Sequence, residues 1–291
     1  MKRQTPQRNA APAARKPLLI AGLGPEGSYS HQAAVKCFGS HDQFVGCTSF
    51  PEVLDLVAQK KAHVGMLPIE NSIEGGVNAA HDCLIHTDLV ICGEYYLPVD
   101  NVLCAAQNHQ SIQRIYSHPQ PLGQCRQWLL AHYPHVEQVS VSSTSEGAHR
   151  AQTDKNAAAI SSPFAASLYG LKILARRISD AEDNTTRFLV MGREPFPFKS
   201  SDKKSYKTSL LFAVAHEVGA LSHILSIFAS KKINLLKIAS RPAPHKKWEY
   251  LFFVDVAGHQ QQPALTEALN QVRKKTLWLK ILGSYPEHPH V

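Results

Sequence analysis

Short segments in the first 195 residues concentrate side chains that bind anions or donate hydrogen bonds. They cover residues 24–30, 67–77, 116–125 and 181–190. They offer mostly hydroxyl and amide groups, with a guanidinium at Arg187. Donors of this kind suit electrostatic and hydrogen-bond catalysis on a carboxylate substrate. No nucleophile elbow and no Ser-His-Asp spacing accompanies them.

The first segment resembles a dinucleotide-binding loop only in its glycines, which follow the G-x-G-x-x-G form over residues 22–27. Pro25 removes one backbone N–H from the loop, and the next strand-like run ends in Thr48 and Ser49 without the acid that would bind a ribose. Two interpretations stay open. The segment is a strand-to-helix turn with Ser28 or Ser30 as N-cap, or it is an anion-binding turn suited to a carboxylate.

The other segments also have purely structural interpretations. Glu70 and Asn71 could only shape a turn before the Gly75-Gly76 break, and His118-Pro119 is ordinary turn chemistry. Thr185-Thr186 could be simple strand formers, and Arg187 a surface charge. From these residues alone, the chain is a ligand-binding α/β protein.

The segments must be positioned by short apolar runs that alternate with helical patterns from residue 17 to 195, which predicts parallel α/β sheets. Two lobes with a ligand cleft between them suit this length. The first three segments follow strands, and the fourth enters one. Strands are expected at residues 17–21, 44–47, 63–68, 89–97, 102–105, 114–117, 136–141, 157–160 and 189–192, and helices at 31–38, 50–59, 77–84, 122–132, 144–155 and 164–169.

A segment rich in Pro, Ser and Lys then interrupts the pattern, with a linker expected at residues 196–206. Strands are expected at 208–214, 233–240, 248–256 and 277–283, with helices at 220–230 and 264–274. This βαββαβ order predicts a ferredoxin-like unit. Both alternating sets of residues 248–256 are apolar, which indicates a second covered face and hence a partner subunit, unless the protein simply tolerates exposed apolar residues.

Composition excludes several classes of protein. The chain has 291 residues, 44% apolar and 19% charged, and no apolar run of the roughly 18 residues that span a membrane. Five basic residues in positions 1–16 leave only +3 of the +8 net charge to the remainder, so we expect a disordered basic tail and no nucleic-acid surface. The six cysteines form no C-x-x-C pair and predict reduced thiols in a cytoplasmic protein. His132 and His135 flank Pro134 without partner ligands, so no metal site is expected.

Taken together, the segments resemble the prephenate dehydratase family over residues 18–283. The resemblance is carried by Gly24-Pro25-x-Gly27-Ser28-Tyr29-Ser30, Pro68-Ile69-Glu70-Asn71-Ser72, Ser117-His118-Pro119-Gln120 with Gln124-Cys125, Asn184-x-Thr186-Arg187-Phe188, Gly219-Ala220-Leu221-Ser222 and Ser240-Arg241-Pro242. It implies a catalytic region at 17–195 made of two periplasmic-binding-protein-like lobes. Lobe 1 is expected at about 17–96 and 177–195 and lobe 2 at about 97–176. An ACT regulatory domain is expected at 207–284.

The resemblance also implies roles for single residues. Thr186 is the expected catalytic residue, and no cofactor is expected. The expected substrate-binding residues are Ser28, Tyr29, Ser30, Glu70, Asn71, Ser72, His118, Gln120, Gln124, Arg187 and Phe188. Phenylalanine is expected to act on a homodimer or homotetramer through Gly219, Ala220, Leu221, Ser222, Ser240, Arg241 and Pro242.

The chain departs from the family pattern at two positions. Ser28 stands where many relatives have Thr, which keeps the hydroxyl. Ala239 stands where the family usually has Glu, which puts phenylalanine regulation in question. No helical chorismate mutase segment precedes the first strand, so a monofunctional enzyme is expected. Arogenate dehydratase and a non-catalytic solute-sensing protein are the alternatives.

Overall fold

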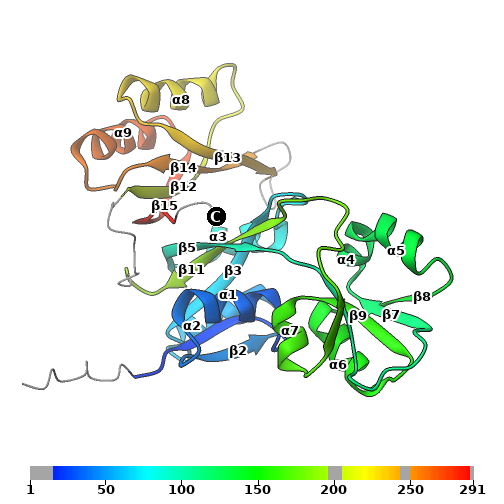
Figure 1. The fold of residues 1–291 in the computed structure, drawn as a ribbon. Coiled ribbons are helices and arrows are strands. Elements are labelled where there is room, and N and C mark those ends of the chain that lie inside the picture. Colours follow the sequence, from blue (N-terminus) through cyan, green and yellow to red (C-terminus); the bar gives the residue numbers. More distant parts are fainter. Residues whose placement is uncertain (1–15, 196–204, 243–249, 289–291) are drawn as a thin grey trace, which may run out of the picture.

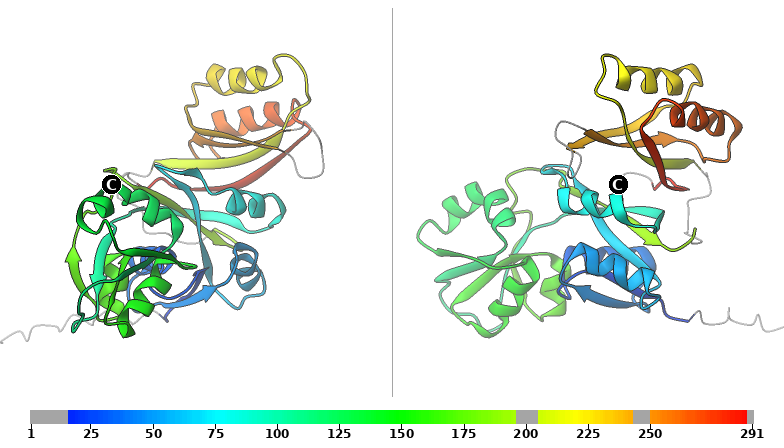
Figure 2. Two further views of the ribbon diagram at one scale, coloured as in Figure 1. Left: turned by 90° about the vertical axis from the view of Figure 1, so that its right-hand side faces the viewer. Right: turned by 180° about the vertical axis from the view of Figure 1, so that it is seen from behind.

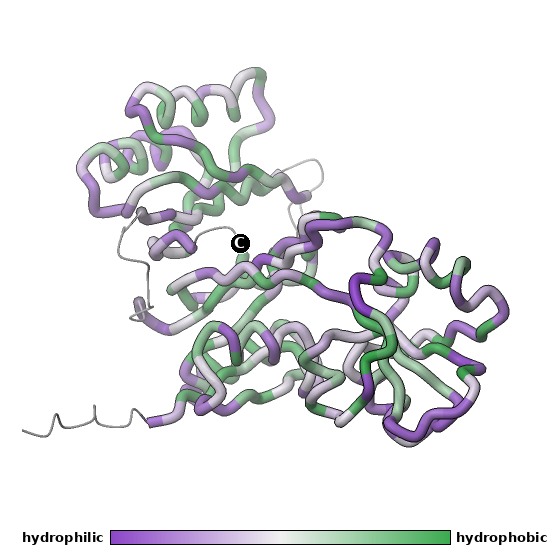
Figure 3. Tube along the Cα trace, in the orientation of Figure 1, coloured by the Kyte–Doolittle hydropathy of each residue, from purple (hydrophilic) through white to green (hydrophobic). Residues whose placement is uncertain are grey.

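The computed structural model describes residues 16–195, 205–242 and 250–288. The tail predicted at 1–16 therefore lies almost wholly outside the described residues, as does most of the linker predicted at 196–206. The described chain folds into two α/β lobes and a C-terminal unit that rests on the first lobe (Figure 1 and Figure 2). Hydrophobic residues gather along the strands, and hydrophilic residues dominate the outer loops (Figure 3).

Lobe 1 is built on a sheet with the order β2-β1-β3-β11-β5, to which β4 adds at β3. Helix α1 packs on one face, and helices α2 and α3 pack on the other. The elements are β1 (Leu19–Leu23), α1 (Tyr29–Phe38), β2 (Gln43–Cys47), α2 (Phe50–Ala58), β3 (Val64–Asn71), β4 (Gly75–Gly76), α3 (Asn78–His86), β5 (Val90–Pro98) and β11 (Thr185–Gly192).

Lobe 2 has a sheet with the order β10-β6-β9-β7-β8. Its elements are β6 (Val102–Ala105), β7 (Arg114–Ser117), α4 (Pro119–Gln124), α5 (Arg126–His132), β8 (Glu137–Ser140), α6 (Thr144–Thr153), β9 (Ala157–Ser161), α7 (Pro163–Leu168) and β10 (Lys172–Ala175). The chain enters this lobe after β5 and returns to lobe 1 before β11, so two strands of lobe 1 continue into the connections between the lobes.

The predicted parallel pairing is confirmed only in part, because both sheets are mixed: β1 pairs in parallel with β2 and β3, and β7 with β8 and β9. Strand β11 runs antiparallel to both β3 and β5, and β6 runs antiparallel to β9 and β10. The helix predicted at 122–132 is two helices, because Cys125 leaves the helical region at φ −111° and ψ 17°. Strands β4 and β10 were not predicted at all.

Two strand boundaries differ from the prediction in a way that matters for the site. Strand β11 begins at Thr185, four residues before the predicted start, and β3 continues through Asn71. The residues that were expected in loops therefore lie inside strands. Because consecutive side chains of a strand point to opposite faces, neighbours such as Thr186 and Arg187 cannot share a site.

The C-terminal unit has the predicted βαββαβ order. Its antiparallel sheet has the order β13-β14-β12-β15, with α8 and α9 packed on one face. The elements are β12 (Tyr206–Ala213), α8 (Ala220–Ser230), β13 (Leu235–Pro242), β14 (Tyr250–Ala257), α9 (Pro263–Arg273) and β15 (Trp278–Pro286).

The second apolar face of this sheet is covered by the same chain, so it does not indicate a partner subunit. Leu251 and Phe253 of β14 join one buried cluster with Leu84 of α3 and Ile91 of β5. At Gly283 of β15 the two backbones approach so closely that a Cβ would collide with Ile91. The sheet therefore rests directly on lobe 1, on the face that carries α3 (Figure 2).

Polar contacts from the C-terminal unit also reach α3. Lys280 of β15 donates to the carbonyl oxygens of Leu84 and Ile85, both at 3.2 Å, and to that of Thr87. A cation at the carbonyl end of a helix satisfies acceptors that have no intrahelical partner and complements the helix dipole. This contact fixes the end of α3 against the C-terminal sheet.

Replacing His81 by glutamine should weaken the pH dependence of stability. His81 lies on α3, is buried, and packs its ring edge-on against Phe253, with a centroid distance of 4.7 Å. Burial lowers its pKa, against the opposing effect of its hydrogen bond to the carbonyl of Val77. The unfolded chain binds the proton near pH 6.5, whereas the folded chain binds it only at a lower pH. The contribution of neutral His81 to the free energy of unfolding is therefore complete above about pH 6.5 and is lost as the pH falls.

Urea unfolding at about pH 7 and about pH 5 measures this effect. The free energy of unfolding of the parent should fall more than that of His81→Gln over this interval. The same substitution at the exposed His41 is the control and should leave the difference unchanged. Equal pH dependence in the parent and His81→Gln would contradict the expectation.

Candidate active site

A cavity of about 320 Å³ lies between the two lobes, where the residues predicted from the sequence converge. Lobe 1 contributes the turn before α1 and the ends of β3 and β11. Lobe 2 contributes the starts of α4 and α6. The lining residues include Ser28, Tyr29, Ser30, Asn71, His118, Gln120, Gln124, Ser142, Ser143, Thr144, Asn184, Thr186 and Phe188.

The centre of the cavity holds a hydrogen-bonded pair, Thr186 and Asn71, which lie directly opposite each other on β11 and β3. The Oδ1 atom of Asn71 accepts from the backbone N–H groups of Ile73 and Glu74, both at 3.0 Å. Its amide nitrogen must therefore be the group that faces Thr186, and it donates to the Thr186 Oγ1 atom at 3.0 Å. The Thr186 hydroxyl thus accepts from the protein and keeps its own proton for a ligand.

A β-bulge brings Asn71 to this side of the sheet. Arg187 pairs with Glu70 and Phe188 pairs with Pro68, so Ile69 is one extra residue in β3. Such a bulge re-aims the side chains that follow it. Glu70 accordingly falls on the face of Ile69, toward the C-terminal sheet, and Asn71 falls on the face of Pro68, toward the cavity.

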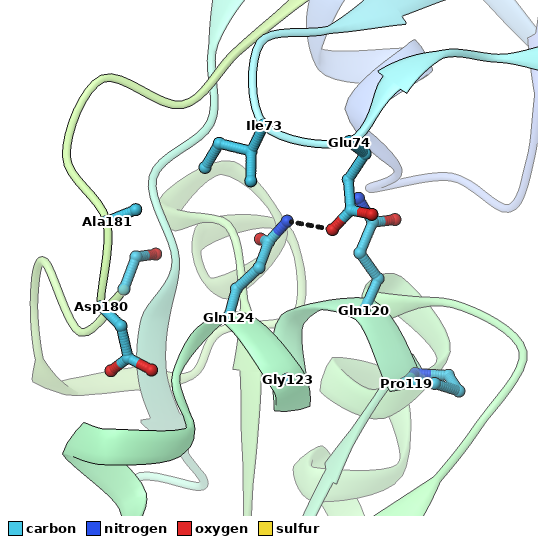
Figure 4. A pocket seen from close by; sticks show the side chains of 9 residues that line it. Ile73, Glu74, Pro119, Gln120, Gly123, Gln124, Asp180 and Ala181 are labelled. Carbon is cyan, nitrogen blue, oxygen red and sulfur yellow. Dashed lines mark hydrogen bonds between the residues drawn. The ribbon is translucent and has the colours of Figure 1, made fainter.

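The pair belongs to a longer network that crosses between the lobes. Asn71 also donates to the Oδ1 atom of Asn184 at 2.6 Å, and Asn184 donates to the Oε1 atom of Gln124 in α4 at 3.3 Å. Gln124 in turn donates to Glu74 at 3.2 Å, at the edge of a second, open cavity of about 570 Å³ (Figure 4). Lobe 2 therefore helps to hold the amides that orient Thr186.

The turn before α1 places its hydroxyl groups differently. Ser28 is the N-cap of α1: its Oγ accepts from the N–H of His31 at 3.2 Å and donates to the carbonyl of Leu23 at 2.8 Å. Tyr29 donates to Oδ1 of Asn101 at 2.9 Å, and burial raises its pKa, so it stays a neutral anchor. Ser30 is buried and lines the cavity.

Gly27 is required in this turn for two reasons. Its φ is +80°, and a Cβ there would lie 2.6 Å from the Oγ of Ser145 in lobe 2. Ser145 and Tyr169 both donate to the carbonyl of Glu26, Tyr169 at 3.0 Å. The turn is thus fastened to lobe 2 at the edge of the cavity. Ser28 as the N-cap confirms the first of the two interpretations, the strand-to-helix turn. The same turn also lines the cavity, and anion binding there stays a prediction.

On the opposite wall, His118 caps α4 and Gln120 lies in its first turn. The Nδ1 atom of His118 accepts from the N–H of Gln120 at 3.3 Å, which assigns the proton of the neutral ring to Nε2. This wall also carries Ser142, Ser143 and Thr144, which were not among the expected site residues. The S-x-x-E pattern from Ser143, whose Oγ accepts from the N–H of Glu146 at 3.0 Å, signals the start of α6 and was available in the sequence.

Three of the predicted substrate-binding residues do not line the cavity. The hydroxyl of Ser72 donates to the carbonyl of Asp183 at 3.0 Å and accepts from the N–H of Thr185 at 2.9 Å, so it fixes the loop to β11. Glu70 pairs with a lysine of the C-terminal unit. Arg187 is buried on the same side. Glu70 and Arg187 face away from the cavity because the strands that carry Thr186 and Asn71 on one face carry Arg187 and Glu70 on the other.

The predicted regulatory residues lie on two elements of the C-terminal unit. Gly219 caps α8 at φ +80°, and Ala220, Leu221 and Ser222 form the first turn of that helix. Ser240, Arg241 and Pro242 end β13, where Arg241 makes a two-pronged ion pair with Asp82 of α3 at 2.9 and 3.0 Å. Ala239 faces the cluster between the domains and packs against it.

Within the described ranges, no group of three or more His, Cys, Asp or Glu side chains is arranged to hold a metal ion. Across the same residues, every helix falls short of the length and apolar character needed to cross a bilayer. The groups that line the cavity are hydroxyl, amide and imidazole groups and two helix N-termini. Such a set can bind an anionic ligand and donate a proton or hydrogen bond to it.

Comparisons with known proteins agree with this description. A family model for prephenate dehydratase matches residues 20–196, and a model for the ACT domain matches residues 208–274. A bifunctional chorismate mutase/prephenate dehydratase from Aquifex aeolicus is 41% identical over 273 residues, which is 94% of this chain and 74% of that protein.

Two solved structures resemble the whole chain. A prephenate dehydratase from Arthrobacter aurescens in complex with L-Phe is 32% identical, with a TM-score of 0.83 over 94% of this chain and 92% of that chain. A protein described as GqqA, a novel type of quorum quenching acylase, is 30% identical, with a TM-score of 0.82 over 93% of this chain and 98% of that chain.

Proposed function

This chain belongs to the prephenate dehydratase family, and from that premise we infer that it converts prephenate to phenylpyruvate. The reaction removes carbon dioxide and the ring hydroxyl. The electron pair of the breaking C–C bond enters the ring as hydroxide leaves, and a proton turns the hydroxide into water. The observation that carries the inference is the orientation of Thr186, whose hydroxyl accepts from Asn71 and so presents its proton to the cavity.

The aromatic product makes the overall reaction strongly favourable. The barrier lies in the departure of hydroxide, which is a poor leaving group. A hydrogen bond delivered to the departing oxygen lowers that barrier. The pKa of a free Thr hydroxyl is far too high for it to serve as a simple acid, so Thr186 acts as an oriented donor. The proton that turns the departing hydroxide into water comes from the solvent, and Thr186 holds the departing oxygen by its hydrogen bond while that proton is taken up. Because Asn71 is fixed by two backbone amides, the donor needs little reorganisation at the moment of reaction.

Prephenate carries two carboxylates, and the cavity has a suitable group on each wall. The N-termini of α1 and α6, each ten residues long, face it from opposite lobes, with Ser30 on one side and Thr144 on the other. Helix N-termini favour anions through unpaired N–H groups and the helix dipole. The carboxylate that departs should be held less tightly, because strong binding of its ground state would oppose decarboxylation.

We further propose that phenylalanine inhibits the enzyme through the C-terminal domain, in a homodimer or homotetramer. The support is the ACT match over residues 208–274 and the L-Phe complex of the Arthrobacter aurescens relative. The proposed binding residues are the first turn of α8, from Gly219 to Ser222, and Ser240, Arg241 and Pro242 at the end of β13. Ala239 contributes no carboxylate to such a site.

Purified protein should form phenylpyruvate from prephenate, and phenylalanine should reduce the rate. Phenylpyruvate is measured as the product of prephenate. In a parallel assay with arogenate as the substrate and no added inhibitor, phenylalanine is measured as the product. Turnover of prephenate without any effect of phenylalanine would contradict the regulatory proposal and leave the catalytic one standing. Turnover of arogenate alone would reassign the substrate, and turnover of neither would favour a solute-binding protein.

A further inference from the structure

The pair Thr186–Asn71 has a second pair directly behind it. Arg187 follows Thr186 on β11, Glu70 precedes Asn71 on β3, and the two lie opposite each other in the same sheet register. One pair faces the cavity and the other faces the C-terminal domain. A shift of either rear residue must therefore move the backbone of its neighbour in the cavity.

Arg187 is held by the C-terminal domain through several atoms. Its Nη1 atom donates to Asp255 of β14 at 2.7 Å and its Nη2 atom donates to the hydroxyl of Tyr285 of β15 at 3.0 Å. Its Nε atom donates to Glu94 of β5 at 2.8 Å. Arg187 is 5% exposed and Glu94 is fully buried, so these hydrogen bonds hold the guanidinium in one orientation.

The acids around Arg187 are themselves held by the C-terminal domain. Lys207 of β12 donates to both oxygens of Glu94, at 2.9 and 3.2 Å. Ser209 donates to Asp255 at 2.5 Å. Burial by itself would raise the pKa of Asp255, but the charge of Arg187 and the hydrogen bond from Ser209 outweigh it and keep that pKa below its ordinary range. Asp255 therefore stays ionised opposite Arg187.

Glu70 is held from the same side by a simpler contact. Lys237 of β13 donates to its carboxylate at 2.5 Å, with side-chain exposures of 16% for Lys237 and 38% for Glu70. Each residue of the rear pair thus has its own ion pair to the C-terminal sheet: Arg187 to Asp255 and Glu70 to Lys237.

Stability alone is a poor explanation for this arrangement. Moving charges out of water costs more than their attraction commonly returns, and apolar residues in the same place often stabilise as well or better. The interface already has an apolar cluster around Phe253 and Leu84 that can hold the domains together. What ion pairs add is a fixed geometry, because their strength depends steeply on distance and direction.

We propose that Arg187 and Glu70 are positioning residues, through which the C-terminal domain sets the geometry of the Thr186–Asn71 hydrogen bond. This inference rests on the proposed function. On this proposal, turnover depends on the ion pair of Arg187 with Asp255 and on that of Glu70 with Lys237. None of these residues lines the cavity between the lobes. A conformational change in the C-terminal domain would therefore move the Thr186 hydroxyl through these ion pairs.

Reversing the charges of the partly exposed pair tests the proposal. In the full chain, Lys237→Glu and Glu70→Lys should each lower kcat roughly tenfold and leave KM within about twofold, because a misplaced donor costs rate and not binding. The double variant should return kcat to near the parent value. Lys231→Glu, which breaks the exposed pair with Glu267 between α8 and α9, is the matched control and should leave kcat unchanged.

Tyr285→Phe probes the Arg187 side, because it removes one acceptor and keeps the ring that packs there. It too should lower kcat at constant KM. An unchanged kcat in Lys237→Glu or in Tyr285→Phe overturns the proposal. So does a loss that the double charge reversal fails to restore, since Glu70 would then be acting on the substrate directly.

Hydrogen exchange separates this inference from the proposed function. Backbone amides of residues 66–72 and 185–190 should exchange faster in Lys237→Glu and return to the parent rate in the double variant. This readout needs no turnover. If the parent does not convert prephenate, the proposed function fails, and the exchange result alone supports or overturns the mechanical link.

Discussion

Replacing Thr186 by valine should lower kcat by about a hundredfold to ten-thousandfold, the range expected when a positioned proton donor is lost. Valine keeps the branched shape that suits a strand and removes only the hydroxyl. The amide of Asn71 retains Asn184 as an acceptor at 2.6 Å, and the carbonyl of Thr185 lies 3.4 Å away, so the network around the substituted residue keeps most of its hydrogen bonds. KM should change little.

Thr186→Ser is the matched control for this substitution. Serine restores a hydroxyl at the same atom position, so it should recover a large part of kcat, while the loss of the methyl group loosens its orientation. Phenylpyruvate formation measures kcat, and circular dichroism with thermal unfolding checks the fold. Parent-like activity in Thr186→Val would remove Thr186 from the mechanism. If the parent itself binds prephenate without converting it, and Thr186→Val binds it equally well, the solute-binding alternative is favoured.

Patterns of local sequence predicted much of the architecture. The C-terminal unit has its helix at 220–230 where the i, i+3, i+4, i+7 pattern of Leu221, Ile224, Leu225 and Phe228 places it. The residues of four separate segments meet in one cavity. Three of these segments follow the carboxyl ends of strands, where ligands of α/β sheets bind, and the fourth leads into β11. Local periodicity and turn chemistry were enough for these features.

The faces of the two central strands were not predictable in this way. The prediction began β11 at Leu189 and so left Thr186 and Arg187 in a loop, where both could face a ligand. Alternation within the strand separates them, and the bulge at Ile69 reverses the side chains of Glu70 and Asn71. Both features depend on pairing between strands about 115 residues apart, which no local pattern encodes. The role of Asp255 and Tyr285 was hidden for the same reason.

Replacing Asn71 by aspartate should lower kcat by roughly a hundredfold, because it replaces the amide that donates to Thr186 with a carboxylate oxygen that can only accept. The carboxylate keeps an oxygen for the N–H groups of Ile73 and Glu74, so the loop stays in place. The other oxygen replaces the amide donor. The Thr186 hydroxyl must then donate its proton to the carboxylate, and the cavity loses the donor that the reaction requires.

Two effects of this substitution can be told apart. The added negative charge repels an anionic substrate and raises KM, whereas the reversed hydroxyl lowers kcat at saturating prephenate. Ser72→Ala is the matched control, because Ser72 holds the same loop to Asp183 and Thr185 without reaching the cavity. It should keep near-parental kcat. A variant Asn71→Asp with raised KM and parental kcat would show that Asn71 contributes only charge balance, and that the orientation of Thr186 does not limit the rate.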